Sequence, residues 1–237
     1  MRSIYSGVIA EFVGTFALMF VGGGAIILSN GENLVAIALA HGLILSCMVT
    51  ATMHISGGQI NPAVSLALSM IGRQSGPRTA AFIVAQLAGA VAAAGVLKVG
   101  LMSGWSTQIE TTSLGATLGA FSAAGEAQSA MLTLLFEFIA TFFLMFVIIG
   151  SAVDPRGVGK GPMVGGFAIG LTVAANILFF GPLTGASMNP ARSFGPALAG
   201  GVWEMQYMYW IAPILGAAAA AAAWQWGIGI EEDLKQD

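Results

Sequence analysis

The sequence predicts an all-α membrane protein in which six transmembrane helices and two shorter half-helices form an inverted repeat. Of its 237 residues, 57% are hydrophobic and only 8% are charged, whereas soluble globular chains carry about 25% charged residues. So few charges cannot cover a water-soluble surface, which excludes a soluble enzyme and a disordered chain. The net charge of -3 comes without a basic stripe, so nucleic acid is not an expected partner.

Six apolar tracts are the expected spans. Each is long enough, at about 1.5 Å per residue, to cross roughly 30 Å of hydrocarbon. The first tract is too long for a cleavable signal peptide. An even number of spans places both termini on one side of the membrane. The tracts lie at about 5–28, 33–53, 79–97, 129–153, 161–181 and 205–230.

The basic residues predict the orientation, because short cytoplasmic loops are enriched in lysine and arginine. With both termini inside, most of them fall on the cytoplasmic side, namely Arg2, Arg73, Arg78, Arg156, Lys160 and Lys235. The longest outer connection, at about 102–127, is rich in Gly, Ser, Thr and Ala and is expected to form an extracellular flap. The sequence therefore predicts a multi-pass protein of the cell membrane, plasma or inner, with cytoplasmic termini.

An internal repeat organises the chain as one domain over 1–237. EFVGTFALMF at 11–20 recurs as EFIATFFLMF at 137–146, and AIALAHGL at 36–43 recurs as VGGFAIGL at 164–171. The first repeat covers about 1–110 and the second about 127–230. Each repeat holds three spans, an odd number, so the second begins on the opposite face of the membrane. Matching short elements should therefore face each other at the midplane.

Those matching elements are the tripeptides Asn61-Pro62-Ala63 and Asn189-Pro190-Ala191. Asn is a favoured helix N-cap and Pro is favoured at the first helical position. About ten largely apolar residues follow each tripeptide, too few to span, so each is expected to begin a half-helix inside the membrane. Two helix N-termini would meet there, with partial positive charge and amide donors. Such a site suits an uncharged hydrogen-bond acceptor and opposes a cation or a proton.

Together these motifs resemble the aquaporin, or major intrinsic protein, family. The AEFVGT opening, HISGGQINPAV and GASMNPARSFGPAL match the family pattern, and the similarity covers essentially the whole chain. The resemblance implies a narrow pore through a six-plus-two helix fold. It also implies a homotetramer in the lipid bilayer with one pore per subunit, and passive conduction of water or small neutral solutes without enzymatic activity.

The resemblance also implies an outer constriction. Its four residues, assigned by their spacing from Asn61 and Asn189, are His41, Ile177, Ala186 and Arg192. This set departs from the water-channel pattern of Phe, His, a small residue and Arg, and from the glycerol-facilitator pattern of Trp, Gly, Phe and Arg. It is closer to plant tonoplast-type members, which have His and Ile at the first two positions. Ser193 stands where glycerol facilitators typically carry Asp. Water is expected to pass, along with small neutral solutes such as ammonia, urea or hydrogen peroxide.

Two intramembrane carboxyl groups, Glu11 and Glu137, occupy equivalent positions in the repeats and are expected to support the loops before the half-helices. Gln86 is expected to assist in the first repeat, although its counterpart is Pro213. For His54, the sequence leaves open whether it donates to loop carbonyls or lines the cytoplasmic mouth.

Backbone carbonyls of the two loops are the expected acceptors along the pore. They belong to Gly57, Gly58, Gln59 and Ile60 in the first loop and to Gly185, Ala186, Ser187 and Met188 in the second. With two histidines and one cysteine, no metal site is expected, and no cofactor either.

Three alternatives stay open at this point. The first is a polyol facilitator of the same family. The second is a proton-coupled secondary transporter that uses Glu11 and Glu137, since intramembrane carboxyl groups often mark proton paths. The third is a closed junctional protein with the same fold.

Overall fold

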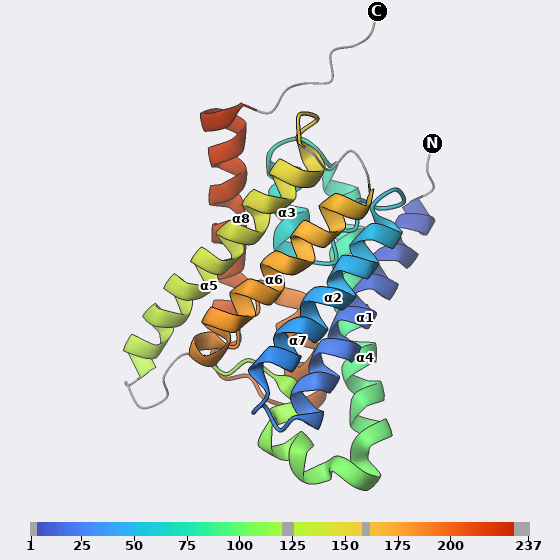
Figure 1. Cartoon of the computed structure of the whole chain (residues 1–237), viewed down its shortest axis with the longest axis vertical. Helices are drawn as coiled ribbons and strands as arrows, with labels where there is room; N and C mark the ends of the chain where they lie inside the picture. Colours follow the sequence, from blue (N-terminus) through green and yellow to red (C-terminus); the bar gives the residue numbers. More distant parts are fainter. Residues whose placement is uncertain (1–3, 120–125, 158–161, 230–237) are drawn as a thin grey trace, which may run out of the picture.

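The computed structural model describes residues 4–119, 126–157 and 162–229, whose long helices lie side by side in one tilted bundle (Figure 1). Within these residues, six helices are long and apolar enough to cross a membrane, which confirms the predicted spans. They are α1 (Ile4–Leu28), α2 (Leu34–Thr52), α4 (Gly76–Thr111), α5 (Glu126–Ile148), α6 (Pro162–Thr184) and α8 (Met208–Ala222). Short π-helical segments, Ile149–Val153 and Ala223–Ile228, extend α5 and α8.

The two half-helices are α3 (Pro62–Met70) and α7 (Pro190–Gly200), of 9 and 11 residues. We call the face at which α1 begins and α8 ends the inner face, and the opposite face the outer face; Figure 1 shows the inner face at the top. A prediction fails on the outer side, where residues 102–111 were expected in a loop but continue α4. A kink at Trp105, with φ -134° and ψ 23°, turns this last part of the helix.

Helix packing follows the repeat. Within the first repeat α1 packs on α4, within the second α5 packs on α8, and α2 packs on α6 between repeats. The half-helices are exchanged, because α3 lies mainly against α8 and α7 mainly against α4. Each half-helix is therefore held mainly by a helix of the other repeat.

Glycines at equivalent positions allow this close packing. A methyl group on Gly89 of α4 would lie 2.4 Å from the carbonyl oxygen of Phe12, and one on Gly216 of α8 would lie 2.3 Å from that of Phe138. Small residues let helix backbones approach in a membrane, where dispersion contacts and not water exclusion hold helices together. The repeat therefore preserves the helix spacing as well as the helices.

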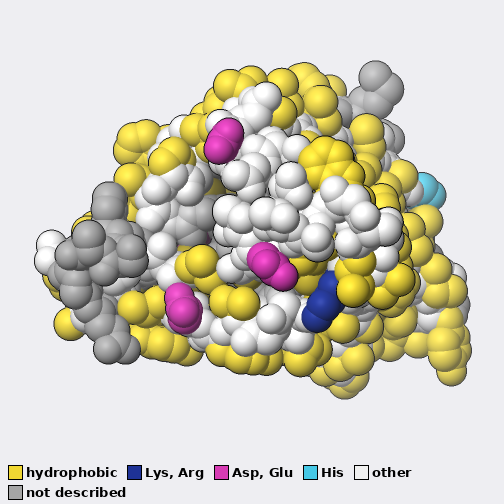
Figure 2. Space-filling view, turned by 90° about the horizontal axis from the view of Figure 1, so that it is seen from below, with side chains coloured by type: hydrophobic (Ala, Val, Ile, Leu, Met, Phe, Trp, Pro, Cys, Tyr) yellow, Lys and Arg dark blue, Asp and Glu magenta, His cyan; other side chains and the backbone are white. Residues whose placement is uncertain are grey.

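Charged side chains are few on the outer face, where apolar side chains surround the rim (Figure 2).

At the end of the π-helical segment after α5, Arg156 forms a 2.5 Å ion pair with Asp154. Its guanidinium donates to that carboxyl group and lowers the pKa of Asp154 below the ordinary value. The pair closes the turn through which the chain leaves the membrane.

Candidate functional site

The two Asn-Pro-Ala tripeptides begin α3 and α7 as capped helices. The Asn61 side chain accepts a 2.9 Å hydrogen bond from the backbone N–H of Ala63, and the Asn189 side chain accepts one of 3.0 Å from that of Ala191. Proline occupies the first helical position of both. Each asparagine thus satisfies an otherwise unpaired N–H of its own helix and keeps its side-chain amide nitrogen for another partner.

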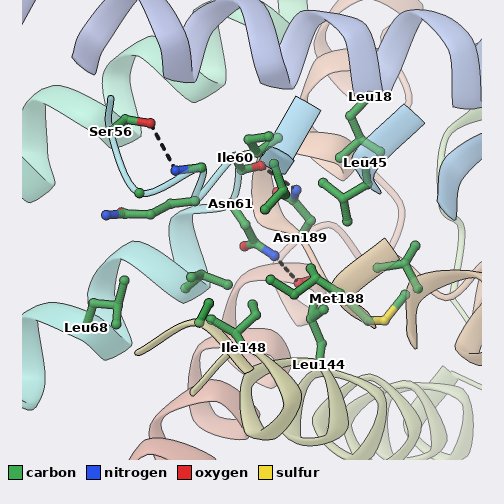
Figure 3. A pocket seen from close by; sticks show the side chains of 18 of the residues that line it. Leu18, Leu45, Ser56, Ile60, Asn61, Leu68, Leu144, Ile148, Met188 and Asn189 are labelled. Carbon is green, nitrogen blue, oxygen red and sulfur yellow. Dashed lines mark hydrogen bonds between the residues drawn. The ribbon is translucent and has the colours of Figure 1, made fainter. Parts of the chain in front are cut away.

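That nitrogen joins the two repeats (Figure 3). Nδ2 of Asn61 donates to the carbonyl oxygen of Met188 at 2.8 Å, and Nδ2 of Asn189 donates to that of Ile60 at 2.8 Å. Residues 127 and 129 positions apart are thereby held at one point near the middle of the bundle. Because an amide nitrogen carries two N–H groups, each asparagine has a second donor beyond this cross-bond.

The loops before the half-helices have matching and strained backbones. In the first loop Gly57, Gly58 and Ile60 have positive φ, and in the second loop Gly185, Ala186 and Met188 do. Positive φ is costly for a β-branched residue such as Ile60, at φ 55°. A conformation of this kind persists only where surrounding contacts hold it.

Glu11 of α1 provides those contacts in the first loop. Its Oε1 accepts from the Ser56 hydroxyl at 2.6 Å and from the Gln59 N–H at 2.9 Å. Its Oε2 accepts from the Ile60 N–H at 2.6 Å and from the Gln86 amide at 2.8 Å. The carboxyl group is fully buried. It therefore fixes the backbone N–H groups of the strained residue and of the residue before it.

Glu137 of α5 makes the equivalent contacts in the second loop. Its Oε1 accepts from the Thr184 hydroxyl at 2.6 Å and from the Ser187 N–H at 2.9 Å. Its Oε2 accepts from the Met188 N–H at 2.8 Å. Among the described residues Glu137 has no counterpart of the Gln86 bond, because Pro213 stands at the equivalent position of α8.

Arg192 and His41 meet at the outer end of the site. Arg192, 4% exposed, donates to the carbonyl oxygen of Gly115 at 3.0 Å, and its other terminal nitrogen lies 3.5 Å from Nε2 of His41. The His41 Nδ1 lies 2.9 Å from the Ile37 carbonyl of its own helix. Since a carbonyl can only accept, Nδ1 carries a proton, and since a guanidinium can only donate, Nε2 faces Arg192 as an acceptor.

Sequence reasoning missed the segment that holds this end together. Residues 113–115 have positive φ, which turns the Gly115 carbonyl toward Arg192. Beyond them, the Thr117 hydroxyl lies 2.8 Å from that of Ser193. The Tyr209 hydroxyl donates to the Thr184 carbonyl and accepts from the Gly119 N–H. A composition rich in Gly, Ser and Thr gave no signal of these partners.

One cavity of about 460 Å³ connects these features. It runs from Arg73 and Ser75 at the inner face, past both asparagines, to His41, Ile177, Ala186 and Arg192. An apolar wall that sequence reasoning did not assign lines much of it, formed by Leu18, Leu45, Val49, Val64, Leu68, Leu144, Ile148, Ile169 and Val173. Part of this wall is visible in Figure 3. The repeat offset could have found several of these positions, because Val49, Val64 and Ile169 are the equivalents of Ile177, Arg192 and His41.

Two predicted site residues lie elsewhere. Gly185 is not among the residues that line the cavity; its α-carbon faces Thr117, which a methyl group there would approach to 2.9 Å. His54 is exposed in the turn after α2, and among the described residues it neither lines the cavity nor hydrogen-bonds to the loop. The structure therefore gives neither of the two roles considered for His54 a contact, and the turn directs this side chain to the surface.

Comparison with known proteins gives the family. The model of the major intrinsic protein family matches residues 2–224. This chain belongs to the major intrinsic protein family. Aquaporin TIP4-4 of Zea mays is 39% identical over 224 residues, covering 90% of this chain and 82% of the relative. Nodulin-26 of Glycine max is 42% identical over 217 residues, covering 90% and 74%.

A solved structure agrees with the fold of this major intrinsic protein. The X-ray structure of the aquaglyceroporin from Plasmodium falciparum has a TM-score of 0.84 and 25% identity, covering 95% of this chain and 97% of that one. Similarity at this level extends over the half-helices as well as the spans, so the protein is an integral multi-pass membrane protein of this family.

Proposed function

We propose that the protein is a passive channel that conducts water and small neutral solutes and excludes ions and protons. The observation that carries the proposal is the paired asparagines, held across the repeat by reciprocal hydrogen bonds and lining one continuous cavity. The family is one of channels and not of enzymes, and the relatives named above are aquaporins. No cofactor or metal is needed for such conduction.

The chemistry of the lining supports neutral solutes. A water molecule in the cavity meets donors on one side, from the asparagine amides and Arg192, and apolar side chains on the other. It can exchange bulk hydrogen bonds for these. A cation must lose its hydration shell, and it is also repelled by two helix N-termini and a buried arginine. Desolvation and repulsion both raise its free energy in the channel.

Within the channel we assign the selectivity filter to His41, Ile177, Ala186 and Arg192. Arg192 supplies fixed positive charge and donors, and the Nε2 atom of His41 supplies an acceptor. Ile177 and Ala186 form the apolar side. Because the apolar side replaces a second polar wall, the filter is expected to admit solutes such as ammonia or urea as well as water.

A transporter that uses Glu11 and Glu137 is disfavoured by geometry. Each carboxyl group is fully buried and accepts hydrogen bonds at both oxygens from the loop that it supports. Neither lines the cavity. A proton delivered to either group would displace a loop donor.

The direct test is stopped-flow light scattering on proteoliposomes with water, glycerol, urea and ammonia as separate solutes. Water flow well above that of empty vesicles, with a low activation energy, is expected. Rates equal to lipid alone would reject the channel. Glycerol flux above that of empty vesicles would favour a polyol facilitator. Solute uptake that saturates and follows a pH gradient would favour a transporter.

Assembly and orientation belong to the same proposal. We propose a homotetramer with one channel per subunit, in the cell membrane, with the inner face cytoplasmic. The basic residues Arg73, Arg78 and Arg156 support this orientation, since Arg73 and Arg156 lie in connections next to the inner face and Arg78 lies in the first turn of α4 at that face.

A further inference from the structure

Gly22 of α1 lies directly against the ring of His41. A methyl group at Gly22 would lie 2.4 Å from Cδ2 and 2.4 Å from Nε2 of His41, and 2.7 Å from Cε1. These distances are far inside van der Waals contact. The missing side chain thus forms a notch in α1 that holds the imidazole edge.

The edge in the notch is the one that carries the acceptor. Nε2 lies 3.5 Å from the Arg192 guanidinium, and the opposite edge is tied through Nδ1 to the Ile37 carbonyl. The ring is therefore clamped between its own helix and α1, with Nε2 directed to the arginine. Gly22 touches no solute path itself, because it is absent from the cavity lining.

The free side of the ring is the channel. On the far side of α2 the backbone is fixed, since a methyl group on Gly42 would lie 2.6 Å from the Gly170 carbonyl oxygen of α6. Among the described residues, His41 lines the cavity that it shares with Ile177 and Ala186. A ring that is pushed out of the notch therefore moves toward the solute path.

In the second repeat the positions equivalent to Gly22 and His41 are both occupied by isoleucine. The repeat offset places Ile148 at the position equivalent to Gly22 and Ile169 at the position equivalent to His41. Both isoleucines line the inner part of the cavity. Where no ring has to be accommodated, a large side chain stands in place of the glycine.

We propose that Gly22 is a specificity-determining positioning residue, whose missing side chain holds the His41 ring out of the channel and sets the width and polarity of the filter. The inference rests on the proposed function, since it concerns the selectivity of that channel. It adds a residue of α1 to a filter otherwise built from α2, α6, α7 and the loop before α7.

The test compares the ratio of urea to water permeability in proteoliposomes of folded protein. Gly22→Ala is expected to lower the ratio by about threefold, with a smaller fall in water permeability, since the displaced ring obstructs the larger solute more. The matched control is Gly24→Ala, because a methyl group there would lie 3.5 Å from Leu97 and away from the filter. It should behave as the wild type.

The double variant Gly22→Ala/His41→Ala separates positioning from simple packing. Without the ring the methyl group has nothing to displace, so the double variant should match His41→Ala alone in both permeabilities. If Gly22→Ala does not fold, a double variant that folds and matches His41→Ala supports the proposal. A double variant that also fails to fold overturns it.

Two further results would overturn the proposal in a conducting protein. One is a wild-type ratio in Gly22→Ala, and the other is a fall that persists in the His41→Ala background. If the wild-type filter excludes urea, water permeability is compared in place of the ratio. Gly22→Ala is then expected to lower the water permeability, and the double variant is expected to have the water permeability of His41→Ala. Absence of water flow in the wild type would instead reject the proposed function.

Discussion

The two repeats build the same loop with different supports. Glu11 accepts from two backbone N–H groups, a hydroxyl and the Gln86 amide, whereas Glu137 accepts from two backbone N–H groups and a hydroxyl. Both loops nevertheless hold three matching residues at positive φ. The backbone contacts are common to both loops and the extra side-chain donor is not. The contacts that both strained loops share are therefore those between a buried carboxyl group and the backbone N–H groups, and the additional side-chain donor is not required.

The two ends of the cavity differ far more than the loops do. At the outer end stand His41, Ile177 and Arg192, and the equivalent inner positions hold Ile169, Val49 and Val64. The scaffold is thus nearly symmetric, while the polarity of its lining is not. We infer that selection takes place at the outer end and that the inner end is a weakly selective path.

Removal of the loop acceptors should have the largest effect. Glu11→Ala and Glu137→Ala each leave buried N–H groups unpaired, at about 1–3 kcal/mol per group. Both should unfold or fail to assemble. Glu11→Ala should be the more damaging because it also removes one of the two acceptors of the Gln86 amide, which keeps only Ser65. Thermal unfolding in detergent measures this, with the exposed Glu110→Ala as control. An unchanged melting temperature for either variant would contradict the support role.

Arg192→Val should break the difference between the ends, since it gives the outer end the type of residue that the inner end has. Loss of the charge and of the bond to the Gly115 carbonyl widens the filter. Urea permeability should rise by about tenfold, corresponding to roughly 1.4 kcal/mol, with measurable ion or proton leak. Lys98→Met, in α4 before the kink at Trp105 and outside the lining of this cavity, is the control. An unchanged urea flux and a tight ion barrier would place selection elsewhere.

Ile177→His should sharpen the difference, because it adds a second polar wall at the outer end. The passage narrows, and the ratio of urea to water permeability should fall by about threefold. Ile177→Leu adds no polar group and should leave the ratio near the wild-type value. A ratio that is the same in the histidine variant, in folded protein, would mean that position 177 does not select solutes.

Ile169→Ala tests the inner end and should have the smallest effect. It removes apolar bulk from the inner cavity but no donor or charge. Water permeability should change by less than about twofold, and the urea-to-water ratio should stay constant, since we propose that the barrier lies at the outer end. The same solute panel measures both quantities. A large shift in the ratio would show that the apolar inner end also selects, and the two ends would then share the task.

Much of the scaffold followed from local sequence chemistry. Hydropathy predicted the six spans, the duplicated EF(V/I)xTF segment predicted the repeat, and Asn-Pro predicted both capped half-helices. The error falls in the stretch 102–111, which has a loop-like composition but continues α4. The sequence also left open where His54 lies, and the structure places it exposed in the turn after α2.

The sequence by itself determined the membrane class, the duplication and the start of each half-helix, because periodicity, span length and capping are properties of neighbouring residues. Only the tertiary structure decided which groups meet. Asn61 and Met188 are 127 positions apart, and Glu11 and Gln86 are 75 apart. The notch at Gly22 exists only because α1 and α2 pack at one register. Such contacts depend on the geometry of several helices at once, and no stretch of the chain carries that geometry alone.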